Sequence, residues 1–76
     1  MNWPESLSWI EYLETRHLII SYYPTIRSLP ENDICIIVFR YHQYTQEEIA
    51  TVFDVTQQSI SKKLKKLSEI GCKILD

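Results

Sequence analysis

Glycine is almost absent from this sequence, which has one glycine and three prolines in 76 residues. Sheet proteins with many tight turns need more glycine, and disordered chains carry fewer hydrophobic residues than the 45% found here. The composition therefore predicts one small all-α domain covering residues 1–76.

Long hydrophobic runs are also missing. No uninterrupted apolar run approaches the ~20 residues that a membrane-spanning helix requires. The first residues, MNWPESLSW, lack the basic and apolar regions of a signal peptide. We therefore expect a cytoplasmic protein that does not contact a membrane.

Recognisable groups of metal-binding or catalytic residues are absent as well. Cys35 and Cys72 lie far apart without a CxxC spacing, so we expect small core residues and neither a zinc site nor a disulfide. His17, His42 and the scattered carboxylates match no pattern of nucleophile, base or metal ligand. The sequence predicts no enzyme, no cofactor and no metal site.

The prolines divide the first half of the chain. Trp3-Pro4-Glu5 is predicted to open an aromatic N-terminal helix within residues 1–23, which Pro24 ends. The inward stripe predicted from helical spacing comprises Trp3, Leu7, Ile10, Leu13, His17 and Ile20. Trp9 and Tyr12 flank this stripe, so the helix either covers the domain or binds a partner.

Residues 24–44 are predicted to form a short helix and then a core helix that begins at Pro30. The expected inward residues of the core helix are Ile34, Ile37, Val38 and Tyr41, widened by Cys35, Ile36 and Phe39. The run ICIIVF is also compatible with a strand, but the proline and the acidic residues that follow it favour a helix.

Residues 45–70 have the pattern of a helix-turn-helix. Thr45 and Glu48 are spaced as a capping box, and Ile49, Val52 and Phe53 fall on one side of the first helix. The pattern breaks at Asp54. Thr56 is predicted to cap a second helix, whose inward residues are Ile60, Leu64 and Leu67.

The second helix leaves polar and basic side chains for its outward face. We predict that these residues bind DNA: Thr56, Gln57, Gln58, Ser59, Ser61, Lys62, Lys63, Lys65 and Lys66. The overall charge of −2 is unevenly distributed, with −3 on residues 1–38 and +1 on residues 39–76. Four of the lysines lie between positions 62 and 66, where they favour contact with phosphates.

About half of the chain, residues 29–67, resembles the C-terminal DNA-binding region of bacterial sigma factors. The matching positions are Leu29-Pro30, Arg40-Tyr41, Glu48-Ile49-Ala50, Val55-Thr56, Ile60 and Leu64. The resemblance implies a four-helix region that reads an upstream promoter element and holds a flap of RNA polymerase.

The chain departs from that family at three places. Asp54 stands where glycine is usual, and the connection through residues 41–44 is shorter and lacks its usual glycine. Gln57, Gln58 and Ser59 replace the usual arginine and glutamate, so we do not expect the usual promoter sequence to be read.

We interpret the chain as a small, sequence-specific regulator of transcription that binds double-stranded DNA and resembles a free-standing sigma-factor C-terminal region. RNA polymerase is a further partner that the resemblance implies, and self-association through the aromatic helix is a separate expectation. The first alternative is a protein-interaction module that binds RNA polymerase or a sigma factor without reading DNA. The second is the N-terminal winged-helix part of a longer regulator, because LKKLSEIGCKIL is similar to a recognition helix that leads into a wing.

Overall fold

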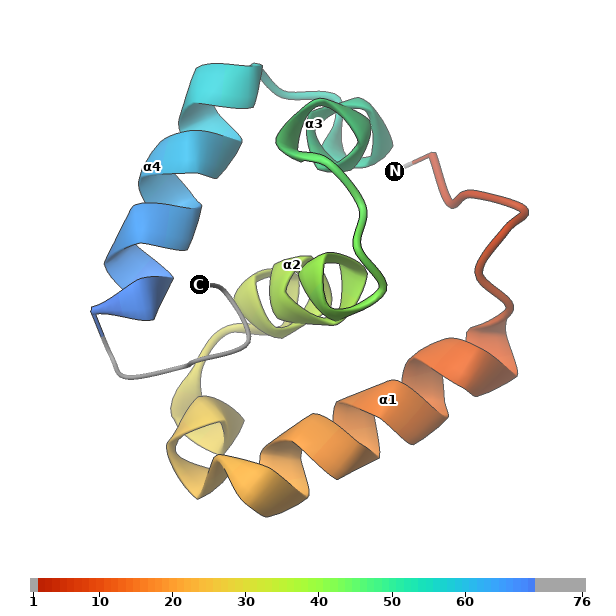
Figure 1. Cartoon of the computed structure of the whole chain (residues 1–76), viewed down its shortest axis with the longest axis vertical. Coiled ribbons are helices and arrows are strands. Elements are labelled where there is room, and N and C mark those ends of the chain that lie inside the picture. The colour runs from red at the N-terminus through yellow and green to blue at the C-terminus, as the bar shows by residue number, and fades with distance from the viewer. Residues whose placement is uncertain (1, 70–76) are drawn as a thin grey trace.

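The computed structural model of the chain describes residues 2–69. Its elements are α1 (Trp9–Tyr22), the short 3₁₀ helix η1 (Pro24–Ser28), α2 (Glu31–Tyr41), α3 (Gln46–Phe53) and α4 (Gln57–Ser68) (Figure 1). The described residues contain no strand, so the all-α prediction is confirmed and ICIIVF lies in a helix.

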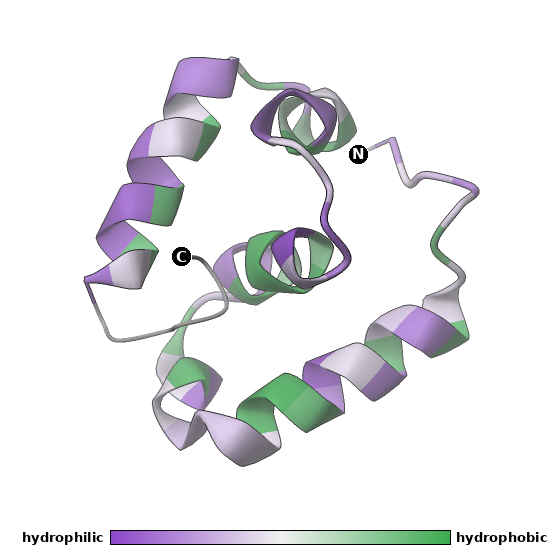
Figure 2. Cartoon of the chain, viewed as in Figure 1, coloured by the Kyte–Doolittle hydropathy of each residue, from purple (hydrophilic) through white to green (hydrophobic). Residues whose placement is uncertain are grey.

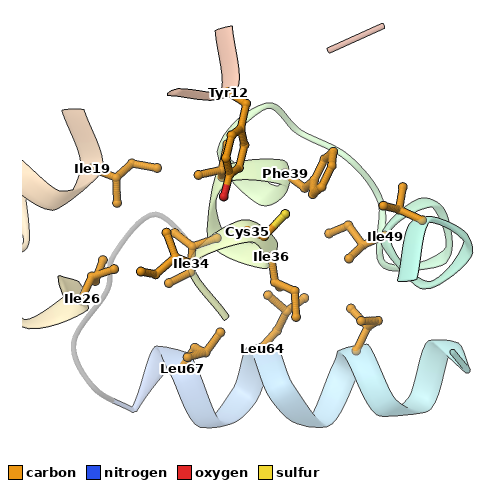
Figure 3. Close-up of a cluster of buried hydrophobic side chains, with 14 of the residues drawn as sticks. Tyr12, Ile19, Ile26, Ile34, Cys35, Ile36, Phe39, Ile49, Leu64 and Leu67 are labelled. Atoms are coloured by element: carbon orange, nitrogen blue, oxygen red, sulfur yellow. The ribbon is translucent and has the colours of Figure 1, made fainter. Parts of the chain in front are cut away.

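Helix α2 occupies the centre of the fold, with α1 on one side and α3 and α4 on others (Figure 1). Every side chain from Asp33 to Phe39 is buried, as expected for a helix that is packed all round. Side chains from α1, α3 and α4 converge on this helix in one hydrophobic cluster (Figure 3). The inward prediction is wrong at Tyr41, which lies beyond the buried stretch at the end of α2 and is exposed.

The start of the first helix differs from the prediction. Helix α1 begins at Trp9, where the Ser8 hydroxyl accepts a hydrogen bond from the Glu11 backbone N–H at 3.1 Å. Serine is a strong helix cap, so this local signal prevails over Pro4. The end of α1 at Tyr22, just before Pro24, agrees with the prediction, as does the short helix that follows.

The predicted inward stripe of α1 is wrong at three positions. The buried residues of α1 are Tyr12, Thr15, Ile19 and Ile20, whereas Ile10, Leu13 and His17 are exposed. The prediction took its phase from Trp3 and Leu7, which are not part of the helix. Without those two residues, the side that carries Tyr12 and Ile19 packs on α2.

Residues 2–8 form a strap that runs from the start of α1 back to α3 (Figure 1). The Asn2 backbone N–H donates to the Val52 carbonyl at 2.7 Å, and the Asn2 side-chain amide donates to the Thr51 carbonyl at 3.2 Å. The hydroxyls of Ser6 and Tyr44 form another hydrogen bond, which joins the strap to the connection between α2 and α3. The strap therefore links α1 to the C-terminal end of α3.

Candidate nucleic-acid interface

The first helix of the candidate motif is fixed at its start by a complete capping box. The Thr45 hydroxyl accepts from the Glu48 backbone N–H at 3.1 Å, and the Glu48 carboxylate accepts from the Thr45 backbone N–H at 2.9 Å. Ile49 and Val52 are buried, as predicted, and Phe53 is partly buried. The local sequence therefore sets both the start of α3 and the side that it turns to the core.

Three residues separate α3 from α4, and the first of them has a left-handed backbone conformation. Asp54 has φ 56° and ψ 48°. The Val55 backbone N–H donates to the Ala50 carbonyl at 3.0 Å, and the Asp54 backbone N–H donates to the Thr51 carbonyl at 3.3 Å. This pair of bonds is a Schellman ending, which satisfies the last carbonyls of α3 and turns the chain sharply into α4.

Helix α4 starts at the predicted cap. The Thr56 hydroxyl accepts from the Ser59 backbone N–H at 3.2 Å. Ile60, Leu64 and Leu67 are buried, so the predicted inward face is confirmed. Figure 2 shows hydrophilic residues along the outer side of this helix.

The outer side of α4 gathers most of the predicted DNA-binding residues. The exposed members of the predicted set are Thr56, Gln57, Gln58, Ser59, Ser61, Lys62, Lys65 and Lys66. Helical spacing places Gln58, Lys62 and Lys65 in one row opposite the buried residues. Lys62, Lys65 and Lys66 form no ion pair with another residue between positions 2 and 69. Their charges are therefore not matched within that part of the chain.

Lys63 differs from the other lysines of α4. Its Nζ atom lies 3.2 Å from Oδ1 of Asp33, whose side chain is only 12% exposed, while that of Lys63 is 40% exposed. The pair joins α4 to the first turn of α2 and lines a groove of about 310 Å³ beside the inter-helix turn. Sequence reasoning missed this contact, because Asp33 follows Glu31 and Asn32 in the polar first turn of α2, where an acidic residue is expected without a partner.

Two titratable groups in the core, on the side of α1, have shifted pKa values. Burial raises the pKa of the Tyr12 phenol, and burial raises the pKa of the Cys35 thiol to about 11. Cys35 is thus protonated and unreactive at neutral pH. The prediction that Cys35 is a core residue is confirmed, whereas Cys72 lies outside the described residues.

The histidines occupy separate positions. His42 Nε2 lies 2.8 Å from the Thr15 hydroxyl, in a hydrogen bond that joins α1 to the end of α2, while His17 is exposed. Within residues 2–69, no group of three or more histidines, cysteines or carboxylates is arranged to hold a metal ion. No helix in that same range is long and apolar enough to cross a bilayer.

Comparison of the chain with models of known protein families, with curated proteins and with solved structures finds no match. The resemblance to the sigma-factor region therefore stays a prediction from the residues that carry it.

Proposed function

We propose that this protein is a small regulator of transcription that binds double-stranded DNA and places α4 in the major groove. The observation that carries this proposal is the capped helix-turn-helix, whose second helix turns only amide, hydroxyl and lysine side chains outward over its first three turns. Helix-turn-helix proteins insert the second helix in this way, while the first helix crosses the phosphate backbone.

Base reading is assigned to the first turn of α4. Gln57, Gln58 and Ser59 lie there with exposed side chains. A glutamine can make a bidentate contact to adenine, so the proposal includes a preference for A·T pairs. This is the end of the helix that meets base edges in proteins of this class.

Phosphate binding is assigned to the lysines further along α4. Lys62, Lys65 and Lys66 are exposed and carry charges that the described residues do not match. Each lysine that neutralises a phosphate releases counterions, so affinity should fall steeply with salt. RNA polymerase is a second partner that we infer from the sigma-factor resemblance alone.

The proposal is tested by separating base reading from phosphate contact. Gln58→Ala should lower affinity for a selected duplex by ~1–3 kcal/mol and leave binding to random DNA almost unchanged, because it removes a base contact. Lys66→Ala should weaken both duplexes alike and make the salt slope shallower by about one, because it removes one phosphate contact. Titrations at several salt concentrations measure both effects.

Arg27→Ala is the matched control, since Arg27 is exposed on η1 and lies outside the motif. It should leave the preference for the selected duplex unchanged. If Gln58→Ala weakens selected and random DNA equally, or if binding does not respond to salt, α4 is not a reading helix. The result would then favour the alternative function, a module that binds a protein partner without reading DNA.

A further inference from the structure

The C-terminal end of α3 is capped in part by a residue from the other end of the described chain. The last four carbonyls of an α-helix have no partner within the helix. In α3, the inter-helix turn supplies backbone donors for the carbonyls of Ala50 and Thr51. The Val52 carbonyl accepts from the Asn2 backbone N–H at 2.7 Å, and the Asn2 side-chain amide also donates to Thr51 at 3.2 Å. Asn2 therefore provides capping bonds that the local sequence of α3 does not.

The Thr51 carbonyl is the point at which the strap meets the inter-helix turn. It accepts from the Asp54 backbone N–H at 3.3 Å and from the Asn2 side-chain amide at 3.2 Å. Asp54 is the left-handed residue through which the chain turns into α4. A residue other than glycine is strained in this conformation, which persists where surrounding contacts fix it. The bond from Asn2 is a contact of that kind, because it holds a carbonyl to which the turn is bonded.

Aromatic packing holds Asn2 beside the turn. The next residue, Trp3, has its ring centroid 5.2 Å from that of Phe39. Phe53, the last residue of α3, packs on the same phenylalanine ring at 6.3 Å. The Trp3 indole N–H donates to the carbonyl of Leu7 at 2.7 Å, and the Leu7 side chain is buried in the core. These anchors reduce the conformational entropy that ordering Asn2 would otherwise cost.

We propose that Asn2 is a positioning residue for the candidate DNA interface, which fixes the turn between α3 and α4 and thereby orients the first turn of α4. In Figure 1, α3 lies between the strap and α4, so Asn2 acts through the end of α3 and not by contact with DNA. Binding sites need supporting residues of this kind, because small errors in orientation weaken them. The inference rests on the proposed function, in which the first turn of α4 reads bases.

Amide hydrogen exchange of the full chain tests the effect on the turn. Asn2→Leu keeps the size of the side chain and removes its donor. The Asp54 and Val55 amides should then exchange about three- to tenfold faster, as expected when one hydrogen bond is lost. The Gln43 and Tyr44 amides form the same pair of bonds after α2, so they are the internal reference and should change less. Asn2→Gln keeps an amide donor and should restore most of the protection.

DNA titrations test the consequence for α4. Asn2→Leu should weaken binding to a selected duplex by about three- to tenfold and binding to random DNA by less, because the base-reading end of α4 follows the turn. The salt slope should not change, because Asn2 carries no charge and no phosphate contact is lost. A loss of stability alone would not alter the ratio of the two affinities, since a smaller folded fraction lowers both equally.

Ser28→Ala is the matched control, because the Ser28 hydroxyl donates to the Thr25 carbonyl at 2.9 Å, at the end of a helix outside the motif. It should alter neither the exchange of Asp54 nor the preference for the selected duplex. Unchanged exchange of Asp54 in Asn2→Leu, equal acceleration at both turns, or an unchanged ratio of the two affinities would overturn the inference. If the unmodified protein does not distinguish the duplexes, the proposed function fails, while the exchange rates, measured without DNA, still decide whether Asn2 fixes the turn.

Discussion

A buried carboxylate in the central helix is stabilised from two directions. Asp33 lies in the first turn of α2, where the helix dipole favours a negative charge, and its residue is 8% exposed. Lys63 of α4 supplies the opposite charge at 3.2 Å. The pair therefore adds a charged contact between α4 and α2 to the packing of the buried face of α4.

We predict that Lys63→Ala mainly lowers stability, whereas Lys62→Ala mainly lowers the salt dependence of DNA binding. Lys63→Ala should lower the free energy of unfolding by about 1–2 kcal/mol, because Asp33 loses its partner, and the partial exposure of the lysine keeps the loss below that of a fully buried pair. The salt slope of DNA binding should hardly change. Lys62→Ala should change stability by less than about 0.5 kcal/mol but reduce the slope by about one.

Urea unfolding and salt titrations of the two variants make the comparison. If Lys63→Ala leaves stability unchanged and reduces the salt slope as much as Lys62→Ala does, the ion pair does not persist in solution. Lys63 would then belong with the phosphate-binding lysines.

At the scale of the elements, two helices end on left-handed residues that are not glycine. Gln43 follows α2 with φ 66°, and Asp54 follows α3 with φ 56°. After α2, the Tyr44 backbone N–H donates to the Phe39 carbonyl at 3.1 Å, and the Gln43 backbone N–H donates to the Arg40 carbonyl at 3.0 Å. Both connections therefore adopt the geometry that glycine favours, although the sequence has no glycine there.

We predict that Gln43→Gly stabilises the protein by about 0.5–1 kcal/mol, because relief of the Cβ clash exceeds the added flexibility of the unfolded chain. For a domain of this size, that change raises the melting temperature by roughly 2–8 °C. Gln58→Gly, at a position with helical geometry, should instead destabilise by about 0.5–1 kcal/mol. A lower melting temperature for Gln43→Gly would show that the side chain of Gln43 makes a contact worth more than the strain.

The elements that sequence reasoning predicted correctly depend on local signals. The caps at Thr45 and Thr56 and the breaks at Pro24 and Pro30 act within a few residues. The buried and outward sides of α4 also follow from its own spacing, so most of the candidate interface could be predicted.

The features that were missed depend on contacts between distant segments. The strap that ends at Asn2, the pairing of Lys63 with Asp33 and the side of α1 that packs on α2 are all set by tertiary packing. Helix α1 carries apolar residues on several sides, and its own sequence does not show which of these sides packs against α2. The start of α1 was different, because the cap at Ser8 was a local signal that the proline concealed.

At the scale of the whole molecule, the Tyr12 phenol and the Cys35 thiol make the free energy of unfolding depend on pH in the alkaline range. Burial raises the pKa of Tyr12 above its ordinary value of 10.0, and burial raises the pKa of Cys35 from 9.0 to about 11. Both groups therefore bind their protons more tightly in the folded chain. Their contribution is complete below pH 9 and is lost as the pH rises, because the unfolded chain ionises first.

We predict that the melting temperature falls between about pH 9 and about pH 11, the unfolded and folded pKa values of the Cys35 thiol, and that Cys35→Ala makes this fall smaller. The comparison is made in a Cys72→Ser background, so that only one thiol titrates. Thermal unfolding across this pH range provides the measurement. A decline of equal size in the Cys35→Ala protein would show that this thiol is not responsible.

The strap also determines the order in which the molecule can assemble. Its bonds join Asn2 to Thr51, which lie 49 residues apart in the chain, whereas the turn between α3 and α4 is local. Closing a loop costs more entropy as the loop grows, so the short-range contacts of α3 and α4 are expected to form early in folding. Asn2 can form its hydrogen bonds to Thr51 and Val52 only after α3 has formed and has packed against α2. The contacts of residues 2–8 with α3 are therefore expected to form last during folding and to break first during unfolding.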